Sequence, residues 1–247
     1  GVRIVTKGGM ARDGHGWVPD GRAKTIRADC EASLGVLDGL PIDLYLIHAP
    51  DPRTPWRTTV RALARLADEG LVQRVGVSNV SRSQLDEAVA LAPIAAIEVA
   101  LNVFDDRVLR GGLIGRCEEL GISVIAHSPF GGPRRAGALA RHPLLAEVAS
   151  RSGAMPAEVA LAWLLGVSDN VIAIPGARRA ETVRSAARAA RLALAASDHD
   201  ALAEAFGRVR RDRFERPRAR PTAQGDADIV VAIGIPGAGK SRAAEDL

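Results

Sequence analysis

At 247 residues, the chain is long enough for one large α/β domain, or for one domain and part of another. Its composition, 47% hydrophobic and 25% charged, is ordinary for a soluble globular protein. The sequence contains neither an apolar run long enough to span a membrane nor a signal peptide, so we expect a cytoplasmic protein without a membrane partner. The net charge of +4 comes from arginines that fall mostly on predicted solvent faces of helices, which does not by itself indicate a nucleic-acid surface.

Six short β-rich runs alternate with helical patterns along the first 206 residues. These runs are Val2–Thr6, Ile42–Ile47, Val72–Val77, Ile94–Val99, Ile122–Ala126 and Val171–Ile174. Caps and breakers predict helix starts at Thr54-Pro55, Ser81 with Gln84, Met155-Pro156 and Ser197 with Asp200, and helix stops at Gly70 and Gly121. Continuous apolar strands separated by amphipathic helices are typical of a parallel sheet covered on both faces.

Two parallel folds compete for this pattern. A doubly wound dinucleotide-binding sheet requires a G-x-G-x-x-G turn after its first strand, and nothing between Lys7 and Gly16 fits that requirement. A (β/α)8 TIM barrel requires eight strands. The chain also begins at Gly1 directly in a strand-like run, so we expect a barrel whose first two strands precede this sequence.

Polar residues follow five of the predicted strands at their carboxyl ends. In chain order they are Lys7, His48, Ser78 with Asn79, Asn102, and His127 with Ser128. Any one of them alone is weak support, since a single buried histidine is more often a core residue than a catalyst. Because active sites of parallel barrels gather at this end of the strands, the set as a whole predicts a polar site at the barrel mouth.

The pattern changes after the last predicted barrel helix. Residues 207–227 are rich in Arg and Pro without an apolar period and are predicted to be a linker, which separates the barrel of residues 1–206 from residues 228–247. A buried strand, Ile229–Ile233, is followed by Gly234-Ile-Pro-Gly-Ala-Gly-Lys-Ser241, which satisfies G-x-x-x-x-G-K-[ST] in full. We expect residues 228–247 to be the start of a P-loop nucleotide-binding domain.

In such a loop, glycines let backbone N–H groups face phosphate oxygens. The predicted ATP and Mg²⁺ site comprises Gly234, Gly237, Gly239, Lys240 and Ser241, with Lys240 on the phosphates and Ser241 as the Mg²⁺ ligand. The motif resembles that of small P-loop kinases, including the polynucleotide-kinase type. A nucleic-acid partner is therefore compatible with that domain, whereas none is expected for the barrel.

Several segments of residues 1–206 resemble the aldo-keto reductase family, in the family's order and spacing. They are Val5-Thr-Lys-Gly-Gly9, Glu31-Ala-Ser-Leu34, Ile42-Asp-Leu-Tyr-Leu-Ile-His-Ala-Pro-Asp51, Gly76-Val-Ser-Asn79, Ala126-His-Ser-Pro-Phe-Gly-Gly132 and Ile174-Pro-Gly176. The resemblance implies reversible reduction of a small-molecule carbonyl, an aldehyde or ketone, by hydride transfer from NADPH.

The resemblance also assigns roles. Lys7 and His48 match the family's catalytic lysine and histidine. The cofactor-binding positions it implies are Ser78, Asn79, Glu98, His127, Ser128, Pro129, Gly176, Arg178 and Arg179. In the family, a tyrosine donates the proton, and a lysine that is paired with an aspartate lowers the pKa of that tyrosine. We expect this aspartate and tyrosine to precede Gly1, so that the chain alone is inactive, because Tyr45 is a packing residue within a strand.

The chain departs from the family pattern at three positions. Glu98 stands where a glutamine is usual, His127 where an aromatic ring is usual, and Ala186 where an asparagine is usual. Arg178 and Arg179 fit either a 2′-phosphate contact or two solvated arginines, so the choice between NADPH and NADH stays open.

Two hypotheses for the function remain. One is an NADPH-dependent reductase fused to a P-loop kinase or ATPase, and the other is a P-loop phosphotransferase whose degenerate barrel is a binding or scaffold domain.

Overall fold

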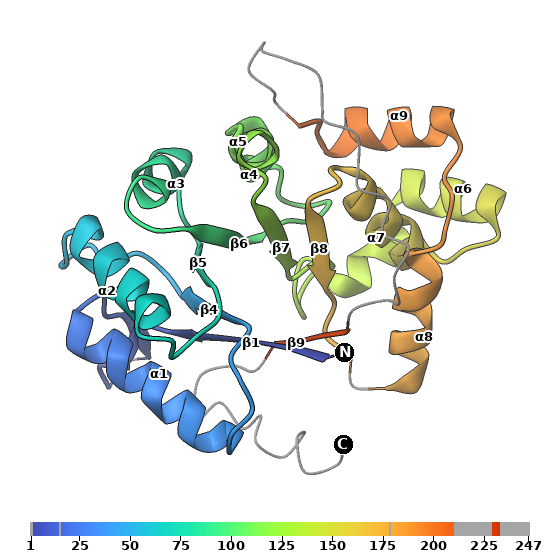
Figure 1. Cartoon of the computed structure of the whole chain (residues 1–247). Coiled ribbons are helices and arrows are strands. Elements are labelled where there is room, and N and C mark those ends of the chain that lie inside the picture. The colour runs from blue at the N-terminus through green and yellow to red at the C-terminus, as the bar shows by residue number, and fades with distance from the viewer. Residues whose placement is uncertain (1, 15, 178, 210–228, 233–247) are drawn as a thin grey trace. The chain divides into compact units, whose positions relative to one another are not determined.

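The computed structural model describes residues 2–14, 16–177, 179–209 and 229–232 (Figure 1). Two compact units divide the chain. The first comprises residues up to Glu98 together with the segment from Thr222, and the second runs from Val99 to Pro221. The first unit contains the predicted site residues Lys7, His48, Ser78, Asn79 and Glu98, and it therefore holds both residues to which the sequence assigns a catalytic role.

A parallel sheet forms the centre of the first unit, with the strand order β9-β1-β4-β5-β6. Its strands are β1 (Val2–Gly8), β4 (Leu44–Ile47), β5 (Val75–Ser78), β6 (Ile94–Ala100, whose last two residues belong to the second unit) and β9 (Ile229–Ala232). Every residue of β4 and β5 is buried, as continuous apolar strands of a covered parallel sheet should be. The predicted strand at 229–233 is confirmed over Ile229–Ala232, which pairs with β1 in this sheet, while Ile233 lies outside the described residues.

Three helices alternate with these strands: α1 (Ala23–Leu37), α2 (Trp56–Asp68) and α3 (Arg82–Val89). Helix α1 contacts β1 and α2, and α2 also contacts β5 and α3, an arrangement that can be followed in Figure 1. Val60, Leu63 and Leu66 recur at helical spacing on α2 and are almost fully buried. These residues form the packed face of α2.

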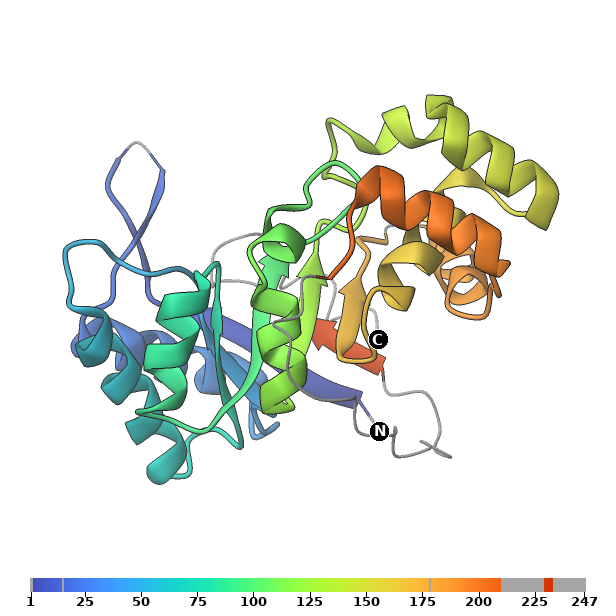
Figure 2. The same cartoon turned by 90° about the horizontal axis from the view of Figure 1, so that it is seen from above.

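A short hairpin interrupts the alternation directly after β1, and it projects clearly in Figure 2. Strand β2 (Met10–Arg12) pairs antiparallel with β3 (Trp17–Pro19). The Arg12 guanidinium lies 4.7 Å from the centroid of the Trp17 ring, which braces the two strands. This hairpin was not predicted from the sequence, although Asp13-Gly14 is a typical hairpin turn signal.

The second unit is mainly helical around one parallel pair, β7 (Ser123–His127) and β8 (Val171–Ile174). Its helices are α4 (Arg107–Arg110), α5 (Leu113–Leu120), the 3-10 helix η1 (Ala136–Arg141), α6 (Pro143–Ser152), α7 (Pro156–Gly166), α8 (Ala180–Ala189) and α9 (Ala196–Phe206). Helix α7 contacts η1, α6, α8, α9 and β8. Trp163 of α7 is buried, and its ring meets the edge of the Phe206 ring at a centroid distance of 5.5 Å.

Most of the predicted helix boundaries agree with the structure, while one helix start and several strand starts differ. The Ser81–Gln84 capping box, the Gly121 stop and the start at Met155-Pro156 are confirmed. The predicted start at Ser197 was wrong, because α9 begins at Ala196 and its cap residue, Ala195, makes no side-chain bond. Three strands begin later than predicted, at Leu44, Val75 and Ser123.

None of the helices within the described ranges combines the length and the apolar composition that a membrane crossing requires.

Candidate active site

The strand register of the first unit places the predicted site residues on one face of the sheet. Lys7 is level with Leu46, Leu46 with Gly76, and Gly76 with Ala96. Because side chains alternate between faces, residues two positions further along share the face of this row. Ser78 and Glu98 lie in that next row and are paired with each other, and His48 comes two residues after Leu46. The polar residues therefore converge at the carboxyl ends of β1, β4, β5 and β6.

Lys7 and Glu98 form an ion pair across this face. The Lys7 ammonium nitrogen, Nζ, contacts Oε1 of Glu98. The Glu98 side chain is 1% exposed and that of Lys7 is 16% exposed, so the pair is largely withdrawn from water. The second carboxylate oxygen, Oε2, is buried and has no hydrogen-bond partner. A buried anionic oxygen without a donor is costly, so this atom is a candidate point of contact for a ligand.

Two small residues stand in the same row of the sheet as Lys7. Gly76 lies on β5, one of the two strands between Lys7 and Glu98, and Ala96 lies on β6, two residues before Glu98. A Cβ atom on Gly76 would overlap the Ala96 carbonyl oxygen and would come within 2.5 Å of Cδ2 of Leu46. A larger residue at position 76 is therefore incompatible with this close packing.

A second group of contacts surrounds His48 and the end of β5. The backbone N–H of His48 donates to the Gly8 carbonyl at 3.0 Å, which fixes His48 beside the end of β1. The Asn79 side-chain amide donates to the His48 carbonyl at 3.0 Å and to Oγ of Ser78 at 3.1 Å. Asn79 has φ 57°, a left-handed conformation that is uncommon outside glycine and that recurs at functional sites.

The second unit holds the predicted residues at the end of β7. His127 is level with Ile174 of β8, and its Nδ1 lies 3.2 Å from Oγ of Ser128. Ser128 also has a left-handed backbone, with φ 51°, and its carbonyl accepts a bond from the Asn102 amide at 3.1 Å. Three other predicted cofactor residues of this unit are placed: Pro129 is buried, and Gly176 and Arg179 are exposed. Arg178 and the predicted P-loop residues Gly234, Gly237, Gly239, Lys240 and Ser241 lie outside the described residues.

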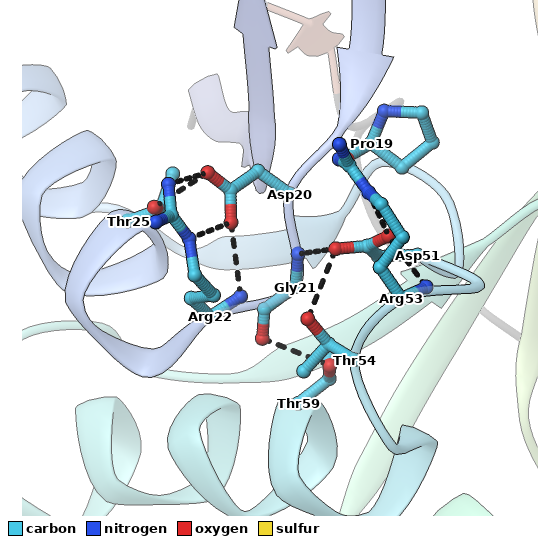
Figure 3. A network of polar contacts seen from close by, with 9 residues as sticks. All are labelled: Pro19, Asp20, Gly21, Arg22, Thr25, Asp51, Arg53, Thr54 and Thr59. Carbon is cyan, nitrogen blue, oxygen red and sulfur yellow. Dashed lines mark hydrogen bonds and ion pairs between the residues drawn. The ribbon is translucent and has the colours of Figure 1, made fainter.

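A loop clamp that was not predicted from the sequence is centred on Asp51, three residues after His48 (Figure 3). Oδ1 accepts the backbone N–H of Arg53 at 2.9 Å and its Nε at 3.0 Å. Oδ2 accepts the backbone N–H of Gly21 and the Thr54 hydroxyl, both at 3.0 Å. Burial raises the pKa of Asp51, but these four donors together outweigh it and hold the pKa below its usual range.

Asp20 extends the clamp toward the start of α1. Its carboxylate accepts Nε of Arg22 at 2.8 Å and the Thr25 hydroxyl at 2.9 Å. The bond from the Arg22 side chain is the largest influence, and with smaller contributions it outweighs burial and lowers the pKa of Asp20 to about 2. The Asp20 backbone N–H donates to the Gly9 carbonyl at 2.8 Å. The clamp thus ties the loop after His48 to the segment that follows Lys7.

Tyr45, the chain's single tyrosine, is fully buried. Its hydroxyl donates to the Ile26 carbonyl of α1 at 3.3 Å, and burial raises its pKa well above the usual value. A Cβ atom on Gly8 would overlap that hydroxyl, so Gly8 is required for the ring to fit. These contacts support the prediction that Tyr45 is a packing residue. Tyr45 pairs with Thr6, one position before the pair of Lys7 and Leu46. Because side chains alternate between the two faces of a sheet, the Tyr45 side chain points to the face opposite the ion pair.

Comparison with known proteins identifies curated relatives. The chain is 32% identical over 205 residues to a probable aldo-keto reductase 1 of Glycine max, an alignment that covers 71% of this chain and 58% of the relative. It is 29% identical over 196 residues to an uncharacterized oxidoreductase of Schizosaccharomyces pombe, with 78% and 62% covered. The chain thus spans about three fifths of the length of these two relatives.

Solved structures give the same result. A thermostable aldo-keto reductase in complex with the inhibitor epalrestat matches with a TM-score of 0.68 and 34% identity, covering 74% of this chain and 67% of that one. An aldo/keto reductase from Klebsiella pneumoniae in complex with NADP and acetate matches with a TM-score of 0.69 and 26% identity, covering 86% and 73%. The family profile described as Aldo/keto reductase family matches residues 1–206, and no comparison supports a P-loop domain beyond them. The chain belongs to the aldo/keto reductase family, whose members are oxidoreductases.

Proposed function

We propose that the protein containing this chain reduces aldehydes or ketones to alcohols with NADPH. The observation that carries the proposal is the convergence of Lys7, His48, Ser78 and Glu98 at adjacent strand ends of a family fold. NADPH supplies the hydride when it is bound. The similarity to an aldo/keto reductase in complex with NADP supports this choice of cofactor.

The described residues fit the nicotinamide carboxamide, which has two N–H donors and one carbonyl acceptor. The buried Oε2 of Glu98 can accept one of those N–H groups. The Ser78 hydroxyl accepts from Asn79 and can donate its own hydrogen to the carboxamide oxygen. Glu98 therefore serves the acceptor part of the usual glutamine's role, and Ser78 serves the donor part.

The other proposed cofactor contacts belong to the second unit. We assign His127, Ser128, Pro129 and Gly176 to the cofactor by their match to the family's late cofactor loops. Arg178 and Arg179 directly precede α8 in the sequence, and we assign both to the 2′-phosphate of NADPH; Arg179 is the residue before the first turn of α8. We expect the R179A variant to weaken the preference for NADPH over NADH. An unchanged preference would contradict the assignment of Arg179.

The chain's own residues act on the substrate carbonyl. His48 donates a hydrogen bond to the carbonyl oxygen and so orients it. The Lys7 ammonium places positive charge where negative charge develops on that oxygen. The proton cannot come from Tyr45, because its hydroxyl is buried against α1. We therefore propose that these 247 residues by themselves give no turnover, and measurable reduction of a model aldehyde by them would contradict this.

Cofactor binding tests the proposal independently of turnover. We expect the chain to bind NADPH in a fluorescence titration. The S78A variant should raise the Kd about tenfold, the effect of losing one hydrogen bond of about 1.4 kcal/mol. The matched control is S81A, which removes a hydroxyl that caps α3 and should leave the Kd unchanged. Equal NADPH affinity of S78A and the unsubstituted chain would contradict the assignment of Ser78.

A second candidate function rests on the complete P-loop motif after the confirmed strand β9. We propose that Gly234–Ser241 binds ATP and Mg²⁺ in the whole protein, with Lys240 on the phosphates and Ser241 on the metal. If the barrel is instead a binding or scaffold domain, this module alone would carry the chemistry. The test is to measure ATP binding by the whole protein with and without the K240A substitution. Loss of ATP binding in K240A supports this proposal, and unchanged ATP binding contradicts it.

A further inference from the structure

The β2–β3 hairpin begins at the polar end of the sheet and projects from it (Figure 2). Strand β2 starts at Met10, three residues after Lys7 at the carboxyl end of β1. Because the active sites of parallel barrels gather at this end of the strands, the hairpin stands beside the proposed substrate site. A two-stranded hairpin is only marginally stable by itself in water, so it can serve as a fixed arm only if its base is held.

Two contacts hold the base of the hairpin (Figure 3). On one side, the Asp20 backbone N–H donates to the Gly9 carbonyl at 2.8 Å. On the other side, Nη2 of Arg53 donates to the Pro19 carbonyl, and Arg53 belongs to the loop that starts at His48. The base of the hairpin is therefore fixed between the segments that follow β1 and β4, the strands that carry the two proposed catalytic residues.

The two strands of the hairpin present a cation beside an aromatic ring. Arg12 and Trp17 are register partners, and the guanidinium lies 4.7 Å from the centroid of the ring. Trp17 is 39% exposed, and Arg12 is exposed as well. Arg22 and Arg53 each bind an aspartate, whereas no acidic side chain within the described ranges forms an ion pair with Arg12. The hairpin thus offers a positive charge and an indole to a molecule that lies against it.

This pair of groups has a defined binding chemistry. An indole stacks on flat rings, and a guanidinium in contact with a ring face keeps N–H donors for a carboxylate. We propose that Arg12 and Trp17 form a subsite for the non-reacting part of the substrate, which favours aldehydes whose carbonyl is joined to a flat ring that carries an anionic group. The inference rests on the proposed function and names the substrate class of that site.

A matched pair of aldehydes tests the role of Arg12. The pair is 4-formylbenzoate and its methyl ester, which differ in charge, and the measurement is the ratio of their kcat/KM values in the whole protein with NADPH. R12M removes the charge but keeps an apolar stem, and it should lower the ratio about fivefold, the upper range for an ion pair open to solvent. The control R61M makes the same charge change at an exposed position of α2. An unchanged ratio in R12M, or an equal fall in R61M, would overturn the proposal.

Replacing Trp17 by Leu separates a substrate contact from a brace of the hairpin. Loss of ring stacking should lower kcat/KM about fivefold for both ring aldehydes. Butanal has no ring, so its kcat/KM should not change. An equal loss for butanal would show that Trp17 only supports the fold of the site and would contradict the subsite.

A binding measurement on the 247 residues makes the subsite independent of turnover. The chain has three tryptophans, whose indole N–H signals can be followed by NMR. Trp163 is buried, and Nε1 of Trp56 donates to the Gln84 carbonyl, so these two are internal references. We expect 4-formylbenzoate to shift the Trp17 signal, which W17L identifies by its loss, and to leave the other two in place.

The two proposals fail in different ways. Turnover of the ring aldehydes with ratios that neither variant changes defeats the subsite and leaves the proposed function standing. If the whole protein reduces none of the three aldehydes, the proposed function fails, and the NMR titration alone decides the subsite. A Trp17 signal that does not move with 4-formylbenzoate then overturns it, and a shift of this signal alone supports it.

Discussion

Two buried carboxylates of the first unit differ in how completely they are bonded. Asp51 accepts four hydrogen bonds, two on each oxygen, and all four donors come from the loops that it joins. Glu98 contacts Lys7 through one oxygen, while the other is buried without a partner. Both side chains are withdrawn from water to a similar extent, at 2% and 1% exposure.

We infer from this difference that Asp51 has a structural role, whereas the bonding of Glu98 agrees with the ligand-binding role proposed for it. The hydrogen bonds of a fully bonded carboxylate offset the cost of removing it from water, so no ligand is needed to stabilise it. An incompletely bonded one leaves the folded chain less stable than it could be and gains a donor when a ligand arrives. Asp51 therefore holds the loop after His48, whereas the bare oxygen of Glu98 supports the proposal that a ligand donates to it.

The largest expected effect comes from replacing Asp51 by Asn. Either orientation of the amide turns its NH2 group toward a backbone N–H, of Gly21 or of Arg53, because each carboxylate oxygen now accepts one. We expect a loss of about 2–4 kcal/mol in the free energy of unfolding. The hydrogen bonds to a charged carboxylate are lost, and the new amide N–H group faces a backbone N–H to which it cannot bond. Urea unfolding checks this. T54A, which removes a single donor, is the control and should lose less.

An acid titration tests the same clamp at Asp20. Its pKa falls from the ordinary value of about 3.9 when unfolded to about 2 when folded. Its stabilising contribution is therefore present above about pH 4 and is lost as the pH falls toward 2. We expect it to be about 1–2 kcal/mol, because solvent around the exposed Arg22 reduces it. The stability difference between the unsubstituted chain and D20N should shrink from pH 6 to pH 3, and a constant difference would contradict this.

The smallest effect is expected at Glu98 itself. Replacing it by Gln loses an ion pair, but it also removes the need to bury a charged oxygen that has no donor. Water can reach Lys7, whose side chain is 16% exposed, so we expect a change below about 1 kcal/mol in urea unfolding. E158Q should lose more, because Glu158 accepts bonds from Met155, Ser185 and Arg188. A larger loss in E98Q than in D51N would remove the distinction between the two carboxylates.

Local patterns were enough to predict most elements of this protein. The apolar runs gave the parallel strands, and Ser81 with Gln84 and Gly121 gave helix ends that the structure confirms. The polar residues at the strand ends were predictable too, because a carboxyl-terminal position on a parallel strand is read directly from the sequence. The β2–β3 hairpin was missed, since strands of three residues are too short to show a period.

The contacts that give those residues their roles could not be predicted in the same way. Lys7 reaches Glu98 across two intervening strands, and Asp51 reaches Gly21, 30 residues earlier. The first of these contacts depends on the register of the parallel strands, and the second depends on where two loops meet. The sequence by itself determined which residues end the strands. Only the tertiary structure decided that one carboxylate is fully bonded while another keeps an oxygen without a donor, because hydrogen bonding depends on atomic positions that strands distant in sequence must supply together.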